Sequence, residues 1–134
     1  MIQNLNPIVQ YIANNTTLVN GTTLQLGYFE ADAPDRCVAV ILTGGRPEFD
    51  LPDFIALRVQ VLTRALDYAT ALEDAQTVFA LLHGAAGITL PVVDSGEAYL
   101  LDTAEAVDYP YSLAPDEAGR FQITTNYILR IQDA

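Results

Sequence analysis

The sequence predicts an α+β fold, with a mainly antiparallel sheet of about four to five strands packed against two helices. Two observations carry this prediction: a long alternating strand that leads directly into an amphipathic helix between residues 54 and 84, and a second long alternating segment near the C-terminus. A helical segment close to the start supplies the other helix. The expected order is α-β-β-β-α-β-β. With 134 residues, the chain fits a single domain, 1–134.

The first element is a short helix. Asn6 is the expected N-cap and Pro7 the first helical residue, where a missing N–H costs nothing. An apolar stripe follows, and Asn14 and Asn15 are expected to end the helix. The stripe comprises Ile8, Val9 and Ile12.

Two strands are expected next. Thr23 to Tyr28 alternates weakly, after a turn at Asn20-Gly21. The run from Cys37 to Leu42 is continuously apolar, which is typical of a central strand buried on both faces. Two glycines and two prolines between Thr43 and Pro52 then predict a loop of about ten residues.

The segment from Phe54 to Gly84 contains the clearest pattern. Up to Arg64 it alternates over eleven residues, which is longer than a usual strand and predicts that one end projects past the core. A helix follows, with Asp67 near its start and Gly84 as its stop. His83 falls in the last turn, where an imidazolium would complement the helix dipole, and we expect a structural role for it. The apolar face of the helix comprises Leu72, Ala75, Val78, Phe79 and Leu82.

The remaining segments complete the sheet. Ala85 to Gly96 is predicted as a loop with a short strand around Thr89 to Val93, and Glu97 to Val107 as a strand. Asp108 to Arg120 is rich in turn residues. Phe121 to Ile131 predicts a long final strand. The residues expected to share one of its faces are Phe121, Ile123, Thr125, Tyr127, Leu129 and Ile131.

Composition limits the classes of partner. The net charge is −11, and all six basic residues are arginines, with no cluster that would bind nucleic acid or an anionic membrane surface. Hydrophobic residues make up 51% of the chain, which suits either a self-association surface or a generous core. Isolated arginines suit either contacts between subunits or pairing within one subunit. No signal peptide or membrane-spanning segment is expected.

Motifs for chemistry are weak. Thr43 to Pro47 begins like a phosphate-binding loop, but no lysine follows and Pro47 prevents an immediate helix. The lone Cys37 is expected to be a small buried hydrophobe. Ser95 and Ser112 would both depend on His83 as a base, and adjacent acids such as Glu73-Asp74 are expected to be solvated. We therefore expect no catalytic residue, no metal site and no cofactor, and a protein that is not an enzyme.

Two segments together carry a family resemblance. The strand–helix unit ALRVQVLTRALDYATALEDAQTVFALLHG and the closing hairpin PYSLAPDEAGRFQITTNYILRI follow an N-terminal helix at NPIVQYI. This order, from Ile8 to Ile131, resembles the tail terminator or tail completion proteins of tailed bacteriophages, often described as minor capsid proteins. The recurrent pieces are a long strand with alternating arginines, a helix ending in Leu-Leu-x-Gly, and an acidic-Gly-Arg turn before an aromatic-Asn strand.

The resemblance implies a virion structural protein. Such a protein forms a ring, usually a hexamer, that caps the finished tail tube, stops tube polymerisation and joins the tail to the head connector. Its partners would be other copies of itself, the tail tube protein and the connector, with DNA passing non-specifically through the lumen. It would be made in the host cytoplasm and end in the virion. The acidity of the chain would keep DNA from adhering to the lumen, although acidity is also common among soluble proteins.

A head-to-tail ring requires two different complementary patches on each subunit. Arg46, Arg58 and Arg64 are the candidate residues for one patch. The loops Thr43 to Asp53 and Ala85 to Gly96 are candidates for contacting the tube or connector. Two alternatives stay open: a neck or connector protein on the head side, and a small dimeric α+β module that binds a ligand or regulates.

Overall fold

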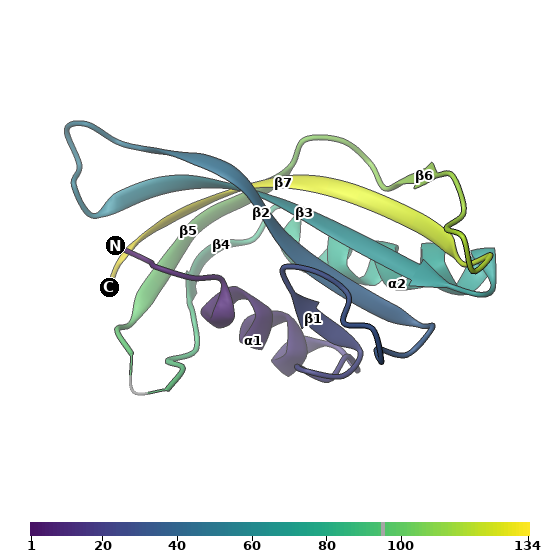
Figure 1. Ribbon diagram of the computed structural model, residues 1–134. Coiled ribbons are helices and arrows are strands. Elements are labelled where there is room, and N and C mark those ends of the chain that lie inside the picture. The colour runs from purple at the N-terminus through teal and green to yellow at the C-terminus, as the bar shows by residue number, and fades with distance from the viewer. Residues whose placement is uncertain (95) are drawn as a thin grey trace.

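The computed structural model describes residues 1–94 and 96–134, which form one layer of sheet and one layer of helices (Figure 1). Helix α1 spans Asn6–Asn15 and α2 spans Tyr68–Leu82. The strands are β1 (Leu24–Leu26), β2 (Cys37–Pro47), β3 (Phe54–Ala65), β4 (Ala86–Thr89), β5 (Tyr99–Ala106), β6 (Tyr111–Leu113) and β7 (Phe121–Asp133). The α+β class is therefore correct, but the seven strands in the described residues exceed the expected four to five.

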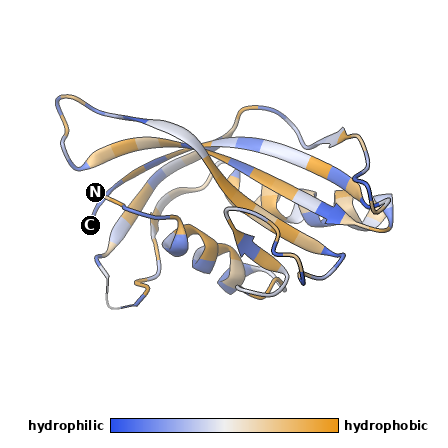
Figure 2. Cartoon of the chain, in the orientation of Figure 1, coloured by the Kyte–Doolittle hydropathy of each residue, from blue (hydrophilic) through white to orange (hydrophobic). Residues whose placement is uncertain are grey.

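The sheet has the order β1-β2-β3-β7-β5-β4, and β6 pairs with β7 beyond the end of β5. Only β1 and β2 run parallel; the other pairs are antiparallel. The long strands β3 and β7 lie at the centre and pair along their whole length, from Phe54↔Gln132 to Ala65↔Phe121. Figure 2 shows both hydrophobic and hydrophilic stretches along β7.

Both helices pack on the same face of the sheet. One large core cluster joins α1 and α2 to the inward residues of β3, β5 and β7. The alternation of β3 decides this face, because Leu57, Val59 and Val61 point inward while Arg58 and Gln60 point to the helix-free face. Five of the six residues predicted to share a face of β7 are buried, and Phe121, at the start of the strand, is exposed. The buried five are Ile123, Thr125, Tyr127, Leu129 and Ile131.

The helices follow the sequence pattern closely. In α2, the carboxylate of Asp67 caps the start by accepting a hydrogen bond from the Thr70 N–H at 3.0 Å, and Gly84 leaves the helix with φ 84°. In α1 the expected cap is displaced by one residue. Leu5 is the N-cap, and the N–H of Asn6, already helical, donates to the Asn4 side chain.

The loop expected from Thr43 to Pro52 is the main error in the predicted elements. Residues up to Pro47 belong to β2, which continues past a register shift at Leu42/Gly44 as the partner of β3. Gly44 adopts φ 141°, and Pro47 is tolerated because β1 covers only Val38–Val40 and leaves this part of β2 at an edge. Glycine and proline here mark an irregular edge strand rather than a loop. For the same reason Leu42 is exposed, although it was expected to be buried.

The remaining differences are shorter. The strand expected at 23–28 is only Leu24–Leu26, and the one expected at 89–93 is Ala86–Thr89, paired with β5. The predicted turn region 108–120 also contains β6. These short strands exist because a long neighbouring strand supplies a pairing edge, which local sequence does not reveal.

Candidate functional site

Most arginines are occupied within the subunit. Arg36 binds Asp74 through two hydrogen bonds of 2.8 Å, and this contact raises the pKa of Arg36. It also explains how Asp74 is buried on α2, where the sequence suggested a solvated acid. Arg130 lies 3.0 Å from a carboxylate oxygen of Glu105 on the neighbouring strand.

Arg120 organises the turn before β7. Its Nε donates to the Asp116 carboxylate at 2.7 Å, and its backbone N–H donates to the same side chain at 2.9 Å. The backbone hydrogen bond is the main reason why the pKa of Asp116 lies below its usual value. The predicted acidic-Gly-Arg turn is therefore a closed hydrogen-bonded unit.

Arg64 lies inside the subunit. Its side chain is 6% exposed, Nη2 donates to the carbonyls of Ala33 and Pro34, and the guanidinium sits 4.1 Å from the ring centroid of Phe29. Burial lowers its pKa. Arg64 thus fastens the loop between β1 and β2 onto the sheet. Of the three arginines predicted to contact another subunit, Arg64 is the one whose guanidinium the subunit already engages.

Arg46 and Arg58 differ from the other four arginines. Both are exposed, and neither has an ionic partner within 4.0 Å in the described part of the chain. They lie close together on the helix-free face, because Gly44 pairs with Arg58 and Arg46 pairs with the nearby Ala56. An acidic protein therefore carries two uncompensated positive charges side by side on its β2–β3 hairpin.

The same hairpin ends in an exposed apolar tip. Figure 1 shows the β2–β3 connection extending well beyond the helices. Phe49 is 97% exposed and Leu51 56% exposed at this tip, and Glu48 and Asp50 flank Phe49. A nearly fully exposed phenylalanine is unusual on a protein surface that does not take part in binding. The sequence predicts a contact loop here, but Phe49 was not among the predicted contact residues. Its position between two acidic residues was the pattern that could have indicated it.

An apolar groove lies near the base of the hairpin, on the helix side of the sheet. It has a volume of about 300 Å³. Leu42 and Leu57 line it from the hairpin, and Leu26 from the end of β1. The N-terminal segment closes the remaining side with Ile2 to Leu5.

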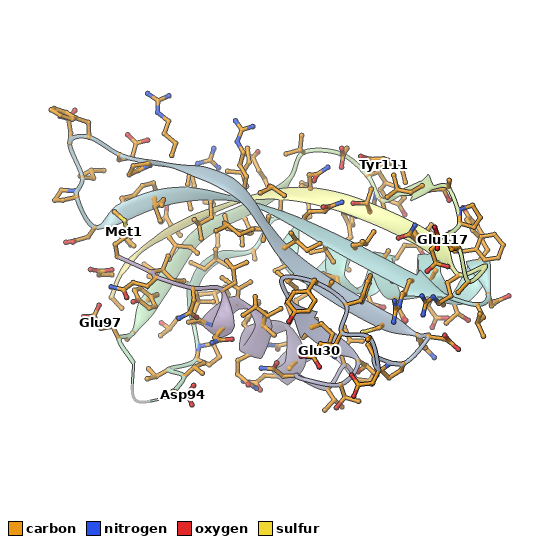
Figure 3. The ribbon with its side chains drawn as sticks, viewed as in Figure 1. Met1, Glu30, Asp94, Glu97, Tyr111 and Glu117 are labelled. Atoms are coloured by element: carbon orange, nitrogen blue, oxygen red, sulfur yellow. The ribbon has the colours of Figure 1, made fainter. Side chains whose placement is uncertain are left out.

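Other exposed apolar side chains lie at the opposite end of the sheet, on both of its faces. They are Leu66, Tyr68, Tyr111, Leu113 and Phe121, all at least 36% exposed. Tyr68 and Phe121 contact each other edge to face, with ring centroids 5.8 Å apart. Figure 3 shows Tyr111 and Glu117 at this end and Met1 and Glu97 at the other. The chain thus exposes apolar side chains at both ends of the sheet.

The groups considered for chemistry have structural roles. His83 Nδ1 accepts a hydrogen bond from the Ala106 N–H at 3.0 Å, and its ring stacks on Phe79. These two contacts join the end of α2 to β5 and give His83 a structural role. Cys37 is fully buried, and burial raises its thiol pKa.

Other candidate sites are equally sparse. Ser112 lies in β6, Ser95 falls outside the described residues, and the would-be phosphate loop is part of β2. Across residues 1–94 and 96–134, no cluster of three His, Cys, Asp or Glu residues could hold a metal ion. The same residues include no helix long and apolar enough to cross a membrane. The prominent features are surfaces rather than a reactive cleft.

The fold and these surfaces define a class: a small α+β protein whose described residues carry exposed apolar side chains and unpaired arginines. A protein family matches most of the chain. The family described as "Bacteriophage tail terminator protein" matches residues 11–133, which is nearly the whole chain. The chain belongs to the bacteriophage tail terminator family, whose members are structural proteins of the phage tail and hence components of the virion. No individual curated protein matches the chain.

Proposed function

We propose that this protein forms a ring, most simply a hexamer, at the head-proximal end of a phage tail tube. There it ends tube polymerisation and joins the tail to the head connector. Family membership supports the tail location. The observation that best supports a ring is that one chain carries an exposed apolar tip at Phe49 and a separate apolar groove beside Leu42, because a closed head-to-tail ring needs two unlike patches per subunit.

The hairpin arginines fit this proposal. Within the described residues, Arg46 and Arg58 have no ionic partner, and they lie on an exposed strand pair. They are the two residues that carry forward the predicted subunit contact. Arg64 contributes indirectly, by holding the loop between β1 and β2 in place.

The acidic surface has a proposed role in the lumen. Much of the acid lies in loops, including Glu30, Asp32, Asp94, Glu97 and Glu117. If loops line the ring opening, like charge would keep the passing DNA from adhering to its wall. The uncompensated arginines of the helix-free face would then face a neighbouring subunit. A structure of the ring with a neutral or basic lumen would contradict this arrangement.

The test is to produce phage particles without this protein and to examine the tails by electron microscopy. The proposal expects tubes that grow past their normal length and tails that do not join heads. Restoring the protein should cap the tubes, and an image of a capped tail should show a ring at the head-proximal end. Normal tail length and attachment without the protein would contradict the proposal. Protein found only on tail-less heads would instead favour a head-side connector.

A further inference from the structure

We propose that the β2–β3 hairpin tip of one subunit docks on the outer edge of β2 in the next subunit, with Phe49 in the groove beside Leu42. The inference rests on the proposed ring, and it names the contact that would build it. The occupant of the groove is a second copy of this chain.

The receiving side combines an open strand edge with an apolar groove. β1 pairs with β2 only at Val38–Val40, so within the described residues no strand covers the outer edge from Ile41 to Pro47. The groove opens beside this edge, between Leu42, Leu57 and the end of β1. Its volume of about 300 Å³ lies at the small end of protein pockets and suits one large side chain.

The inserted side is the hairpin tip. At 97% exposure, Phe49 touches little of its own subunit, and the hairpin carries it away from the helical layer (Figure 1). The tip therefore offers an aromatic anchor to another molecule, and the groove is an apolar site on a different surface of the same chain. Together they form the two unlike patches of a head-to-tail contact.

The charged residues near Phe49 and near the groove favour a second copy of this chain over an unrelated apolar partner. Glu48 and Asp50 flank Phe49, and neither has an ionic partner within 4.0 Å in the described residues. Arg46 and Arg58 also lack such partners, and they project from the strands that border the groove, on the opposite face. When the tip lies across the edge of β2, Phe49 enters the groove on the helix side of the sheet. Glu48 and Asp50 then lie towards Arg46 and Arg58 on the helix-free face. The same docking satisfies both sets of uncompensated charges.

Cysteine crosslinking in assembled tails tests the geometry. A chain carrying Leu42→Cys and Phe49→Cys replaces the native protein, and purified tails are oxidised and analysed without reductant. The proposal expects a ladder of products that reaches the size of the ring. The chain with only the buried Cys37 is the control and should give no ladder. Products that stop at the dimer would overturn the head-to-tail geometry, and the absence of products in tails that contain the protein would overturn the docking itself.

Charge reversal tests the polar contact. Arg58→Glu and Glu48→Arg should each raise the concentration needed to occupy tail ends by about tenfold or more, because each places like charges together. The double variant should recover most of this loss. Two single losses that simply add in the double variant would contradict the contact.

A matched substitution tests the anchor. Phe49→Ser should weaken occupancy of tail ends, whereas Val19→Ser, which removes another exposed apolar side chain that belongs neither to the hairpin tip nor to the groove lining, should not. Equal occupancy for both variants would overturn the role of Phe49. These outcomes are separable from the proposed function: a ring on the tail without the crosslink refutes only the docking, and absence of the protein from tails refutes the proposed function.

Discussion

The two halves of the β2–β3 hairpin have opposite roles, although they are continuous in the chain. The covered half is largely buried, against the helices or beneath the β1–β2 loop. It consists of Cys37–Val40 of β2 and Val59–Ala65 of β3. The projecting half, Ile41–Pro47 with Phe54–Arg58, carries exposed arginines and ends at Phe49. One strand pair thus contributes to the core along one half and leaves the other half exposed. The difference shows that a strand can extend past the core that its own inner half helps to build.

A matched pair of leucine truncations gives the largest expected contrast. Leu24 is fully buried against the covered half and Leu51 is 56% exposed at the tip. Leu24→Ala should lower the free energy of unfolding by about 3 kcal/mol, because it leaves a cavity in the core. Leu51→Ala should change it by less than about 0.5 kcal/mol. Urea denaturation followed by circular dichroism measures both, and equal losses would break the distinction between the two halves.

The anchor at the start of β2 should give a smaller loss. Asp74→Asn keeps the shape of the side chain but removes the charge that binds Arg36 in two hydrogen bonds. Because Arg36 is more than half exposed, the expected loss is only about 1 kcal/mol. The urea midpoint is the measurement, with Glu73→Gln on the exposed side of α2 as the control. A loss no larger than that of the control would mean that Arg36 does not hold β2 to α2.

The turn before β7 should respond to acid. The pKa of Asp116 is lowered from 3.8 chiefly by the hydrogen bond from the Arg120 backbone N–H. A depressed carboxyl pKa stabilises the fold fully above the unfolded value, and this contribution disappears as the pH falls through the folded pKa. Asp116→Asn should therefore flatten the fall in stability below about pH 4. Urea midpoints between pH 3 and pH 7 measure this, and an unchanged slope would contradict it.

The smallest expected effect on folding lies in the projecting half. Arg58→Glu should change the free energy of unfolding by less than about 0.5 kcal/mol, because Arg58 is exposed and unpaired in the subunit. The same variant should weaken the oligomer, as measured by native mass spectrometry or by occupancy of tails. Arg58→Lys keeps the charge and is the control. An unchanged oligomer would count against Arg58 as a contact residue, and a large folding defect would show that the projecting half belongs to the core.

The sequence predicted most of the elements with strong periodicity. β3, α2 and β7 were located closely, because each alternates or repeats over at least ten residues. Thr43 to Pro47 was assigned to a loop, since its glycines and proline disfavour strand locally while pairing with β3 overrides them. β6 was not predicted, and the strand expected at 89–93 lies earlier, at Ala86–Thr89, because each depends on pairing with a longer neighbouring strand. Asp74 appeared to be a solvated acid because its partner, Arg36, lies 38 positions away.

The candidate site was only partly visible in the sequence. Arg46, Arg58 and Arg64 looked alike, as arginines on or beside a long strand. The structure separates them, since Arg64 is bonded to the loop between β1 and β2 and the other two are free of ionic partners in the described residues. The groove was invisible, because it forms where the N-terminal segment, β1 and the hairpin meet.

The sequence by itself determined the α+β class, the two longest antiparallel strands and the acidic, lysine-free surface. These follow from local periodicity and composition, which act along the chain. Only the tertiary structure decided which arginines remain unpaired, where β2 becomes an open edge, and that Phe49 projects while Arg64 is buried. Those outcomes depend on which distant segments meet across the sheet, and burial and charge pairing are settled by that meeting rather than by residue type.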